Sequence, residues 1–377
     1  MFAKLDKNGT INKLEYILKQ VDDDKNLNGS LILACDANDF TPDNINHILK
    51  TCKKPVFGGV FSHIIYNNEK LEKGTIVVGI KQTIKTVILE NLSNSTDLGM
   101  ESIMKDAFKW QDLQDKTMFV FLDGFSENTS KLVDNMFNNW GIFPNYIGGG
   151  AGSLDMGEKP CVITEKGLLE DAVVFALIDL RSGIGVAHGW RPIAGPFKVT
   201  EADGNTVITL NWRPAFKVYK EIVEKISEES FSNWDFFQLA KEFPFGIAKM
   251  SNEMVVRDVI SLNRDKLICV GEVPVNSFVY ILNGNKDSLV EGAAKARMLA
   301  EKSYRKIVDG RDETPKITFF MDCVSRVLCL DSYFDKELEA VYKGNTLVGA
   351  LSIGEIANTG QNYIEFYNKT SIIGLLG

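Results

Sequence analysis

The sequence predicts an α/β protein in which helices cover layered, mixed β-sheets and the chain forms two lobes. Three segments repeat the order strand, helix, glycine loop, strand and strand. Their apolar strands run without alternating polar residues, which is typical of strands buried on both faces and therefore of sheets covered by helices. The length of 377 residues also leaves room for two domains of ~150 residues each.

The first repeat unit covers residues 31–80. It opens with the apolar strand 31–36 and continues into a helix, for which Thr41 is a candidate N-cap and Pro42 the first helical residue. A glycine loop at 57–62 and two strands complete the unit. This order defines the pattern that the two later units repeat.

The second unit covers residues 117–178 and has the glycine loop 148–153. Its helix carries an apolar stripe at positions i, i+1, i+4 and i+5, formed by Leu132, Val133, Met136 and Phe137. Its exit strand begins at Leu169 with the pattern Leu-Glu-x-small-x-Val/Ile, which also begins at Leu71 in the first unit. Strands, helices and glycine loops recur in many unrelated α/β proteins, but this shared pattern favours a repeat.

The third unit covers residues 317–376. It has the strand 317–322, a helix over 335–342 and an exit strand over 370–376. Its glycine loop, 348–352, is one residue shorter between glycine and serine than the earlier ones.

A different region separates the second and third units. The sequence predicts there a hairpin over 199–210, a helix over 214–223, strands over 254–262 and 266–282, and an amphipathic helix over 288–307. The segment 228–236 reads as a polar connection. We therefore place the lobe boundary near it and divide the chain into domains 1–228 and 229–377.

Composition and charge exclude several classes of protein. The formal net charge is −8, and the chain lacks the concentrated basic surface that nucleic-acid binding requires. No stretch of the sequence reaches the roughly 18 consecutive apolar residues of a membrane-spanning helix, and no signal-peptide pattern opens the chain. We therefore expect a cytoplasmic protein that binds no nucleic acid and does not insert into a membrane.

Metal-binding and catalytic motifs are also missing from the sequence. The six cysteines form no Cys-x-x-Cys pair, so we expect reduced thiols and no metal site. Strands follow the glycine loop 148–153, whereas a dinucleotide fingerprint needs a helix there. The segment around Ser352 lacks the strand, turn and helix of a nucleophile elbow. We assign no catalytic residues and expect no enzymatic activity.

Several segments carry a resemblance to a known family. Those similar to the N-terminal FIST domain are 148–153, 185–192 and 211–219. Those similar to the C-terminal FIST domain are 320–326, 349–355 and 366–370. The resemblance runs from about residue 30 to the end of the chain. It implies a FIST N-like domain with the first two units and a FIST C-like domain with the third.

The resemblance to the FIST family also implies a function. It implies a sensory module of bacterial signal transduction that binds a small ligand, such as an amino acid or a similar carboxylate. Some family members are joined to histidine-kinase, cyclic-di-nucleotide or chemotaxis output domains. We find no such domain in the sequence, so we expect the signal to pass to a separate protein of one of these kinds. A non-covalent haem-binding nitric-oxide sensor and a protein-interaction scaffold without a ligand are the alternatives.

The segment His188-Gly189-Trp190-Arg191 is the strongest candidate for one corner of a ligand site. Arg191 offers a planar fork that suits a carboxylate, Trp190 an aromatic wall, and Gly189 room for close approach. In a purely structural interpretation, Arg191 caps backbone carbonyls, Trp190 fills the core and His188 is a satisfied polar group. His188 is also the candidate axial ligand if haem binds; otherwise we expect no cofactor.

Cys323 and Arg326 follow the first strand of the third unit. A neighbouring cation lowers the pKa of a thiol, so Cys323 is a candidate reactive thiol. The alternative is a buried cysteine beside a structural arginine.

Small and polar residues of the glycine loops complete the candidate ligand site. They are Gly149, Gly150, Ser153, Ser352, Gly354, Glu355 and Asn368. If the two lobes face each other, Glu355 would bind the ammonium group of an amino acid and Arg191 its carboxylate. The alternative is that these are loop and strand residues that touch no ligand.

Overall fold

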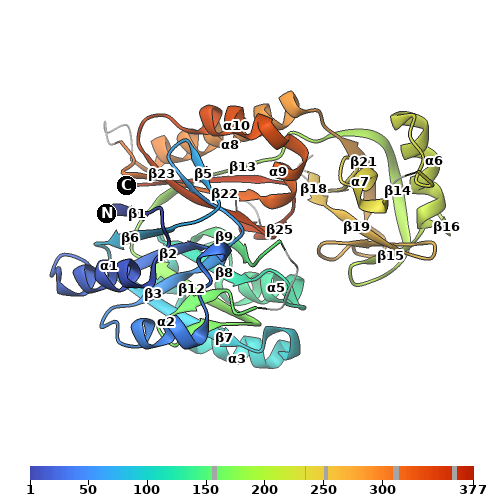
Figure 1. Cartoon of the computed structure of the whole chain (residues 1–377). Coiled ribbons are helices and arrows are strands. Elements are labelled where there is room, and N and C mark those ends of the chain that lie inside the picture. The colour runs from blue at the N-terminus through green and yellow to red at the C-terminus, as the bar shows by residue number, and fades with distance from the viewer. Residues whose placement is uncertain (155–158, 234, 250–253, 309–313, 359–362) are drawn as a thin grey trace.

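The computed structural model describes residues 1–154, 159–233, 235–249, 254–308, 314–358 and 363–377. A larger lobe contains three six-stranded sheets, and a smaller lobe contains an eight-stranded sheet (Figure 1). Both ends of the chain lie on the larger lobe. The α/β architecture predicted from the sequence is confirmed. None of the described helices is both long and apolar enough to cross a membrane.

The larger lobe consists of the three repeat units. The first has β1 (Phe2–Asp6), α1 (Ile11–Asp23), β2 (Gly29–Cys35), α2 (Pro42–Leu49), β3 (Val56–Phe61), β4 (Ile64–Tyr66), β5 (Glu69–Leu71) and β6 (Thr75–Ile80). The second has β7 (Ile84–Glu90), α3 (Asp97–Ala107), α4 (Trp110–Leu113), β8 (Thr117–Asp123), α5 (Thr129–Trp140), β9 (Asn145–Ala151), β10 (Val162–Thr164), β11 (Gly167–Leu169) and β12 (Ala172–Ile178). The third has β13 (Ser182–Ala187), α8 (Lys286–Ile307), β22 (Ile317–Cys323), α9 (Val324–Leu330), α10 (Phe334–Val341), β23 (Thr346–Ser352), β24 (Glu355–Ala357), β25 (Glu365–Tyr367) and β26 (Ser371–Leu376).

The long strands of the three units have one topology. Their orders are β1-β6-β2-β3, β7-β12-β8-β9 and β13-β26-β22-β23. The two strands joined by α2, by α5 and by α9 with α10 run parallel, and the other neighbours run antiparallel. The threefold repeat predicted from the sequence is therefore confirmed. Each unit also includes a strand and a helix before the predicted start.

The short hairpins are exchanged between the units in a cycle. The hairpin β4-β5 of the first unit pairs with β23 of the third, β10-β11 of the second pairs with β3 of the first, and β24-β25 of the third pairs with β9 of the second. Each sheet is thus completed by another unit. Sheets therefore join residues from both sides of the predicted boundary at 228.

The glycine segments lie in strands β3, β9 and β23, so the prediction that they are loops is wrong. Gly58, Gly148 and Gly349 occupy equivalent places in these strands. A Cβ atom at these positions would lie 1.8, 1.8 and 1.9 Å from a carbonyl oxygen of the neighbouring parallel strand. Only glycine fits such a close approach of two backbones.

We expect Gly148→Ala to lower the free energy of unfolding by about 1–3 kcal/mol, because the new methyl group must displace the backbone of β8. Gly99→Ala is the control. Gly99 lies in the first turn of α3, where the nearest neighbour of an added Cβ is the Thr96 hydroxyl at 3.3 Å. Alanine should stabilise that turn by up to ~1 kcal/mol. Urea unfolding followed by circular dichroism measures the free energy of unfolding of both variants. An unchanged value for Gly148→Ala would contradict the close approach of the two backbones.

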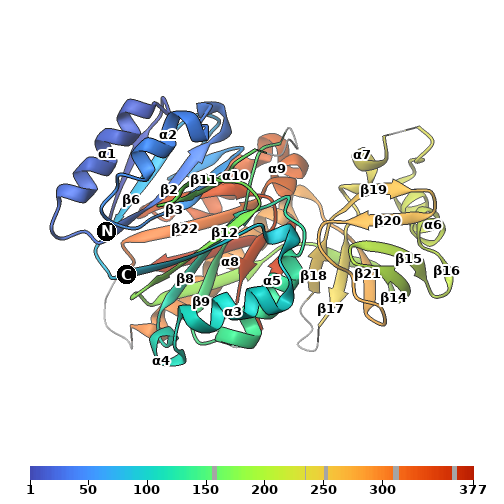
Figure 2. The same ribbon diagram turned by 90° about the horizontal axis from the view of Figure 1, so that it is seen from below.

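Helices cover the outer faces of the three sheets, and the inner faces meet in the centre of the larger lobe (Figure 2). Phenylalanines from all three units form the centre. The ring centroids of Phe57 and Phe119 lie 5.8 Å apart, and those of Phe119 and Phe319 lie 5.1 Å apart. On the outer faces α3 and α5 pack on β8 and β12, while α8 and α10 pack on β22 and β26. Because both faces of each sheet are covered, the strands consist of continuous apolar residues.

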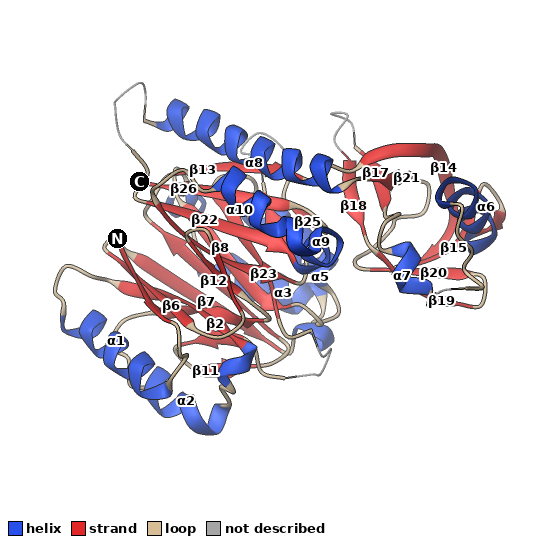
Figure 3. Cartoon of the chain, turned by 45° about the horizontal axis from the view of Figure 1, so that its top comes forward, coloured by secondary structure: helices blue, strands red, loops and turns tan. Residues whose placement is uncertain are grey.

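The smaller lobe is inserted between β13 and α8 (Figure 3). Its elements are β14 (Arg191–Asp203), β15 (Thr206–Leu210), β16 (Arg213–Pro214), α6 (Ala215–Ser227), α7 (Phe236–Ala240), β17 (Phe245–Ala248), β18 (Met254–Arg257), β19 (Val259–Asn263), β20 (Lys266–Cys269) and β21 (Phe278–Asn283). The predicted hairpin over 199–210 is confirmed as the antiparallel pair β14 and β15. All three repeat units therefore share one lobe, and the other lobe is the inserted segment.

Candidate functional site

A buried ion cluster lies where β22 runs into α9. The Arg326 guanidinium lies 3.0 Å from an Asp322 carboxylate oxygen and 2.6 Å from a Glu337 oxygen, and all three side chains are fully buried. Arg326 also donates to the carbonyl oxygens of His188 and Leu289 at 2.6 and 2.9 Å. Burial alone would lower the pKa of Arg326, but the two carboxylates outweigh it and raise that pKa. Burial and the nearby Glu337 raise the pKa of Asp322.

Lys369 forms a second buried ion pair beside this cluster. Its ammonium lies 3.3 Å from an Asp258 carboxylate oxygen, 5.3 Å from the centre of the Trp190 ring and 3.8 Å from the sulfur of Cys329. Its φ of 50° lies in the left-handed region, which is strained for a lysine. Burial is the largest single effect and lowers the pKa of Lys369, but Asp258, Cys329 and Cys323 together outweigh it and raise that pKa, so the amine stays charged. Asp258 belongs to the smaller lobe, and this pair therefore joins the two lobes.

Glu355, the first residue of β24, is also fully buried. Its carboxylate accepts a hydrogen bond from the Ser352 hydroxyl at 2.8 Å and one from the Thr370 backbone N–H at 3.4 Å. Burial raises the pKa of Glu355 to about 8. Burial, and next the Glu355 charge, also raise the pKa of Cys323 well above its usual range. The interpretation of Cys323 as a reactive thiol therefore has no support in the structure, because the thiol is buried and desolvation outweighs the contacts with Lys369 that lower its pKa.

His188 and Trp190 belong to the same buried region. The Trp190 backbone N–H donates to Nδ1 of His188 at 3.0 Å, and the indole N–H donates to the Lys369 carbonyl at 3.2 Å. Burial, and next the Arg326 charge, lower the pKa of His188 to about 4. The imidazole is therefore neutral, and it does not line either of the two pockets described below.

Arg191 points away from this region. Its side chain is 72% exposed and pairs with Glu291 on the surface of α8 at 3.2 Å. Because Glu355 is fully buried, the two residues do not line a common cavity in the described structure. The predicted clamp, with Arg191 on a carboxylate and Glu355 on an ammonium group, is wrong.

The small residues of the candidate site make room for neighbouring protein atoms. A Cβ at Gly189 would lie 2.1 Å from a carbonyl oxygen of α8, and one at Gly150 would lie 2.2 Å from the Ile353 carbonyl oxygen. A Cβ at Gly149 would lie 2.6 Å from the Gly354 carbonyl oxygen, and one at Gly354 would lie 2.1 Å from the Phe366 ring. Their part in ligand approach therefore has no support in the packing.

Two polar residues of the predicted site lie apart. The Ser153 hydroxyl donates to Asp36 at 2.5 Å, between the second and first units. The Asn368 side chain is buried, with its oxygen 3.4 Å from the backbone nitrogen of Asp258. Asn368 therefore belongs to the contact between the lobes.

A pocket of about 480 Å³ lies beside the buried ion clusters, where the lobes meet. We name it the strand-end pocket. It is lined by His63, Lys70, Leu154, Lys241, Glu242, Lys286, Val324, Val327, Leu328, Cys329, Asp331 and Leu351. His63 follows β3, Leu154 follows β9 and Leu351 is near the end of β23, so all three units contribute their parallel strand ends. Ligands of open α/β sheets bind at such carboxyl ends, and pockets also favour lobe boundaries.

The strand-end pocket carries charges of both signs. Its cations are Lys70, Lys241 and Lys286, and its carboxylates are Glu242 and Asp331. Burial and the nearby Lys70 lower the pKa of His63, so this imidazole is neutral near pH 7. A small molecule with an anionic and a cationic group would find partners for both here.

Cys329 connects the pocket to the buried Lys369. The thiol lines the pocket. Its sulfur accepts a hydrogen bond from the Lys369 ammonium at 3.8 Å, and the thiol donates one to the Lys241 carbonyl at 3.5 Å. Lys241 directly follows α7 of the smaller lobe. A ligand in the pocket would therefore touch both lobes and one end of the ion pair that joins them.

The sequence analysis missed the residues that line this pocket. His63 could have been predicted from the sequence, because it follows β3, and the equivalent strands β9 and β23 lead to Ser153 and end at Ser352. The lysines carry no such signal, because single lysines are common on any surface. Among the described residues, no group of three or more His, Cys, Asp or Glu side chains is placed to hold a metal ion.

Comparison with known proteins identifies the family of this chain. The FIST N domain matches residues 31–213, and the FIST C domain matches residues 215–358. This chain belongs to the FIST family. FIST domains are sensory domains of signal transduction, so a sensory role follows from the family. The boundary between FIST N and FIST C lies within the smaller lobe, next to the start of α6.

One relative of this FIST protein is the uncharacterized protein MJ1623 of Methanocaldococcus jannaschii. The two sequences are 20% identical over 85% of this chain, which spans 66% of that protein. The name of this relative states no activity.

Proposed function

We propose that this FIST protein binds a small carboxylate, such as an amino acid, in the strand-end pocket and passes the signal to a separate protein. The observation that carries the proposal is the pocket itself. It lies at the strand ends of all three units, is lined by three lysines and two carboxylates, and includes Lys241 from the smaller lobe. The lysines suit the carboxylate of a ligand, and Glu242 or Asp331 suits its ammonium group.

The contacts under the pocket support a sensory role for it. Asp258 and Arg257 of the smaller lobe contact Lys369 and the Phe366 carbonyl of the third unit, at 3.3 and 2.8 Å. Lys369 in turn contacts Cys329 in the pocket wall. A ligand that binds one arrangement of the lobes more tightly than another shifts the population toward it. A separate histidine kinase, cyclic-di-nucleotide enzyme or chemotaxis protein could then read this change.

A thermal-shift screen of amino acids and dicarboxylates tests the proposal. A ligand at a hundred times its Kd stabilises the folded state by about 2.7 kcal/mol, which raises the Tm measurably. We expect at least one compound of the screen to raise the Tm of the wild type. We expect the double variant Lys241→Ala with Lys286→Ala to lose most of this Tm increase.

The matched control is Lys295→Ala with Lys302→Ala, which removes the same charge from exposed positions of α8. This control should keep the wild-type shift. The proposal fails if no compound of the screen stabilises the wild type, or if both double variants lose the shift equally. An absorption spectrum of protein made with haem supplied tests the haem alternative, because bound haem gives a Soret band.

A further inference from the structure

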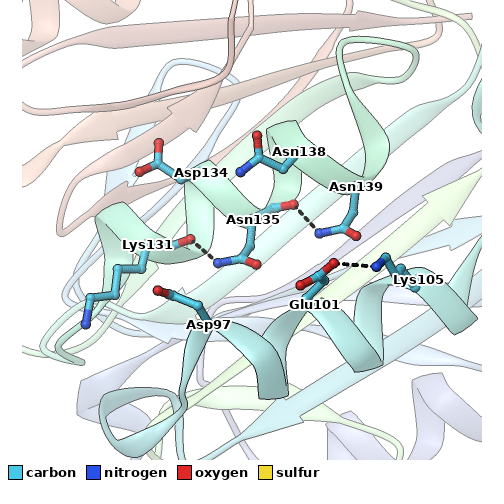
Figure 4. A pocket seen from close by; sticks show the side chains of 8 residues that line it. All are labelled: Asp97, Glu101, Lys105, Lys131, Asp134, Asn135, Asn138 and Asn139. Carbon is cyan, nitrogen blue, oxygen red and sulfur yellow. Dashed lines mark hydrogen bonds and ion pairs between the residues drawn. The ribbon is translucent and has the colours of Figure 1, made fainter.

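A second surface feature lies on the outer side of the second unit. A groove of about 410 Å³ runs between α3 and α5 (Figure 4). Helix α3 lines it with Asp97, Glu101 and Lys105, and α5 lines it with Lys131, Asp134, Asn135, Asn138 and Asn139. The α3 residues recur every four positions and therefore share one face of that helix. The groove shares no residue with the strand-end pocket.

Asn135 forms the floor of this groove. It is only 8% exposed, and its amide nitrogen donates to the Lys131 carbonyl at 2.9 Å. Its amide oxygen has no donor among the described residues and is turned toward Glu101 (Figure 4). Asn139 likewise uses its amide nitrogen on the Asn135 carbonyl, at 2.9 Å. The accessible part of this amide therefore presents an oxygen acceptor to the groove, which an N–H group of a partner can use.

The carboxylates give the middle of the groove a negative potential. Asp97 and Glu101 lie along the α3 side, and Asp134 stands on α5 (Figure 4). Burial, and next the charge of Glu365, raise the pKa of Asp134, and Asp97 adds to this effect. Lys105 forms an ion pair with Glu101 at one end of the groove. The two lysines, Lys105 and Lys131, lie at its sides, so its middle offers hydrogen-bond acceptors.

The partner that fits these features is a protein segment with Lys or Arg side chains. Such side chains carry several N–H donors and a positive charge, which the groove lacks in its middle. Leu98 on α3 is 78% exposed and Phe137 on α5 is 46% exposed, so the same two helices also offer apolar contacts that suit a protein partner. No metal-binding group of three or more His, Cys, Asp or Glu side chains occurs in the described residues.

We propose that the groove between α3 and α5 is the docking site for a basic segment of the separate protein that receives the signal. This inference rests on the proposed function, because it assumes such a partner. It names the partner's chemistry and the place where it binds.

Fluorescence anisotropy of a labelled peptide tests the docking site. The probe is a helical peptide of leucine and alanine with a lysine at every fourth position, and its counterpart carries glutamate in place of lysine. We expect the full-length protein to bind the lysine peptide and not the glutamate peptide. Asp97→Asn with Glu101→Gln should weaken this binding about tenfold, and Lys105→Gln should strengthen it about twofold, because it frees Glu101 from its ion pair.

The matched control is Asp335→Asn with Glu339→Gln, which removes the same charges at the same spacing from exposed positions of α10. It should bind the lysine peptide like the wild type. The inference is overturned if the lysine peptide does not bind, or if both double variants weaken it equally, which would indicate attraction to the net charge alone. Stabilisation by spermidine without binding of the peptide also overturns it, because the groove would then take a small amine.

The ligand screen separates this inference from the proposed function. The groove variant should keep every ligand-induced Tm shift of the wild type. Loss of peptide binding with these shifts intact supports the docking site, whereas a failed screen beside specific peptide binding contradicts only the ligand proposal.

Discussion

Arg326→Met is expected to lower the free energy of unfolding by about 3–5 kcal/mol, the largest effect among the substitutions considered. The guanidinium lies between the buried carboxylates of Asp322 and Glu337 and donates to two backbone carbonyls. Methionine fills similar space but leaves these carboxylates without a counter-charge. It also leaves the carbonyls of His188 and Leu289 without their donor, which adds a desolvation cost.

Arg191→Met is the matched control for this prediction. Its side chain is exposed and its ion pair with Glu291 lies on the surface, so we expect a change within about 0.5 kcal/mol. Adding Glu337→Gln to Arg326→Met should restore part of the stability, because one uncompensated charge disappears. Urea unfolding compares all variants. An Arg326→Met protein as stable as the wild type would show that the cluster does not hold α9 and α10 in place.

Glu355→Gln is expected to change how stability depends on pH. The pKa of Glu355 is about 8 in the folded protein, against 4.5 as its ordinary value. The folded state therefore keeps a proton that the unfolded state loses. The contribution of Glu355 to the free energy of unfolding is largest below pH 4.5, falls as the pH rises toward 8 by up to about 1.4 kcal/mol per pH unit, and levels off above that. Glutamine has no proton to lose, so this slope should disappear.

Unfolding free energies at pH 5, 7 and 8.5 measure this effect. The Glu355→Gln protein should match the wild type near pH 5 and exceed it at pH 8.5. Glu339→Gln is the control, because Glu339 is exposed on α10 and its substitution should leave the slope unchanged. Parallel pH profiles for the wild type and Glu355→Gln would contradict the raised pKa.

Much of the fold could be predicted because each unit carries local signals. Continuous apolar strands and the glycines that face a parallel neighbour recur in all three units. The first strand and helix of the third unit were not recognised as part of it, because the smaller lobe separates β13 from α8 by 98 residues, 188–285. The exchange of hairpins also escaped prediction, because strand partners far apart in the sequence leave no local pattern.

The candidate site could be predicted only in part, for a related reason. His188, Trp190, Arg326 and Glu355 do lie in one buried region, but they are occupied with one another and with backbone groups. Polar residues in apolar segments signal burial, and burial alone does not distinguish a binding site from a structural network. The pocket residues come from six separate parts of the chain, and only folding brings them together.

Hydrogen exchange of the full-length protein tests the central claim, that a ligand binds where the two lobes meet. The probe is the compound with the largest Tm shift in the screen. The account predicts slower exchange in α9 of the larger lobe and at the end of α7, near Lys241, in the smaller lobe. Unchanged exchange at both places, with protection appearing elsewhere, would contradict it.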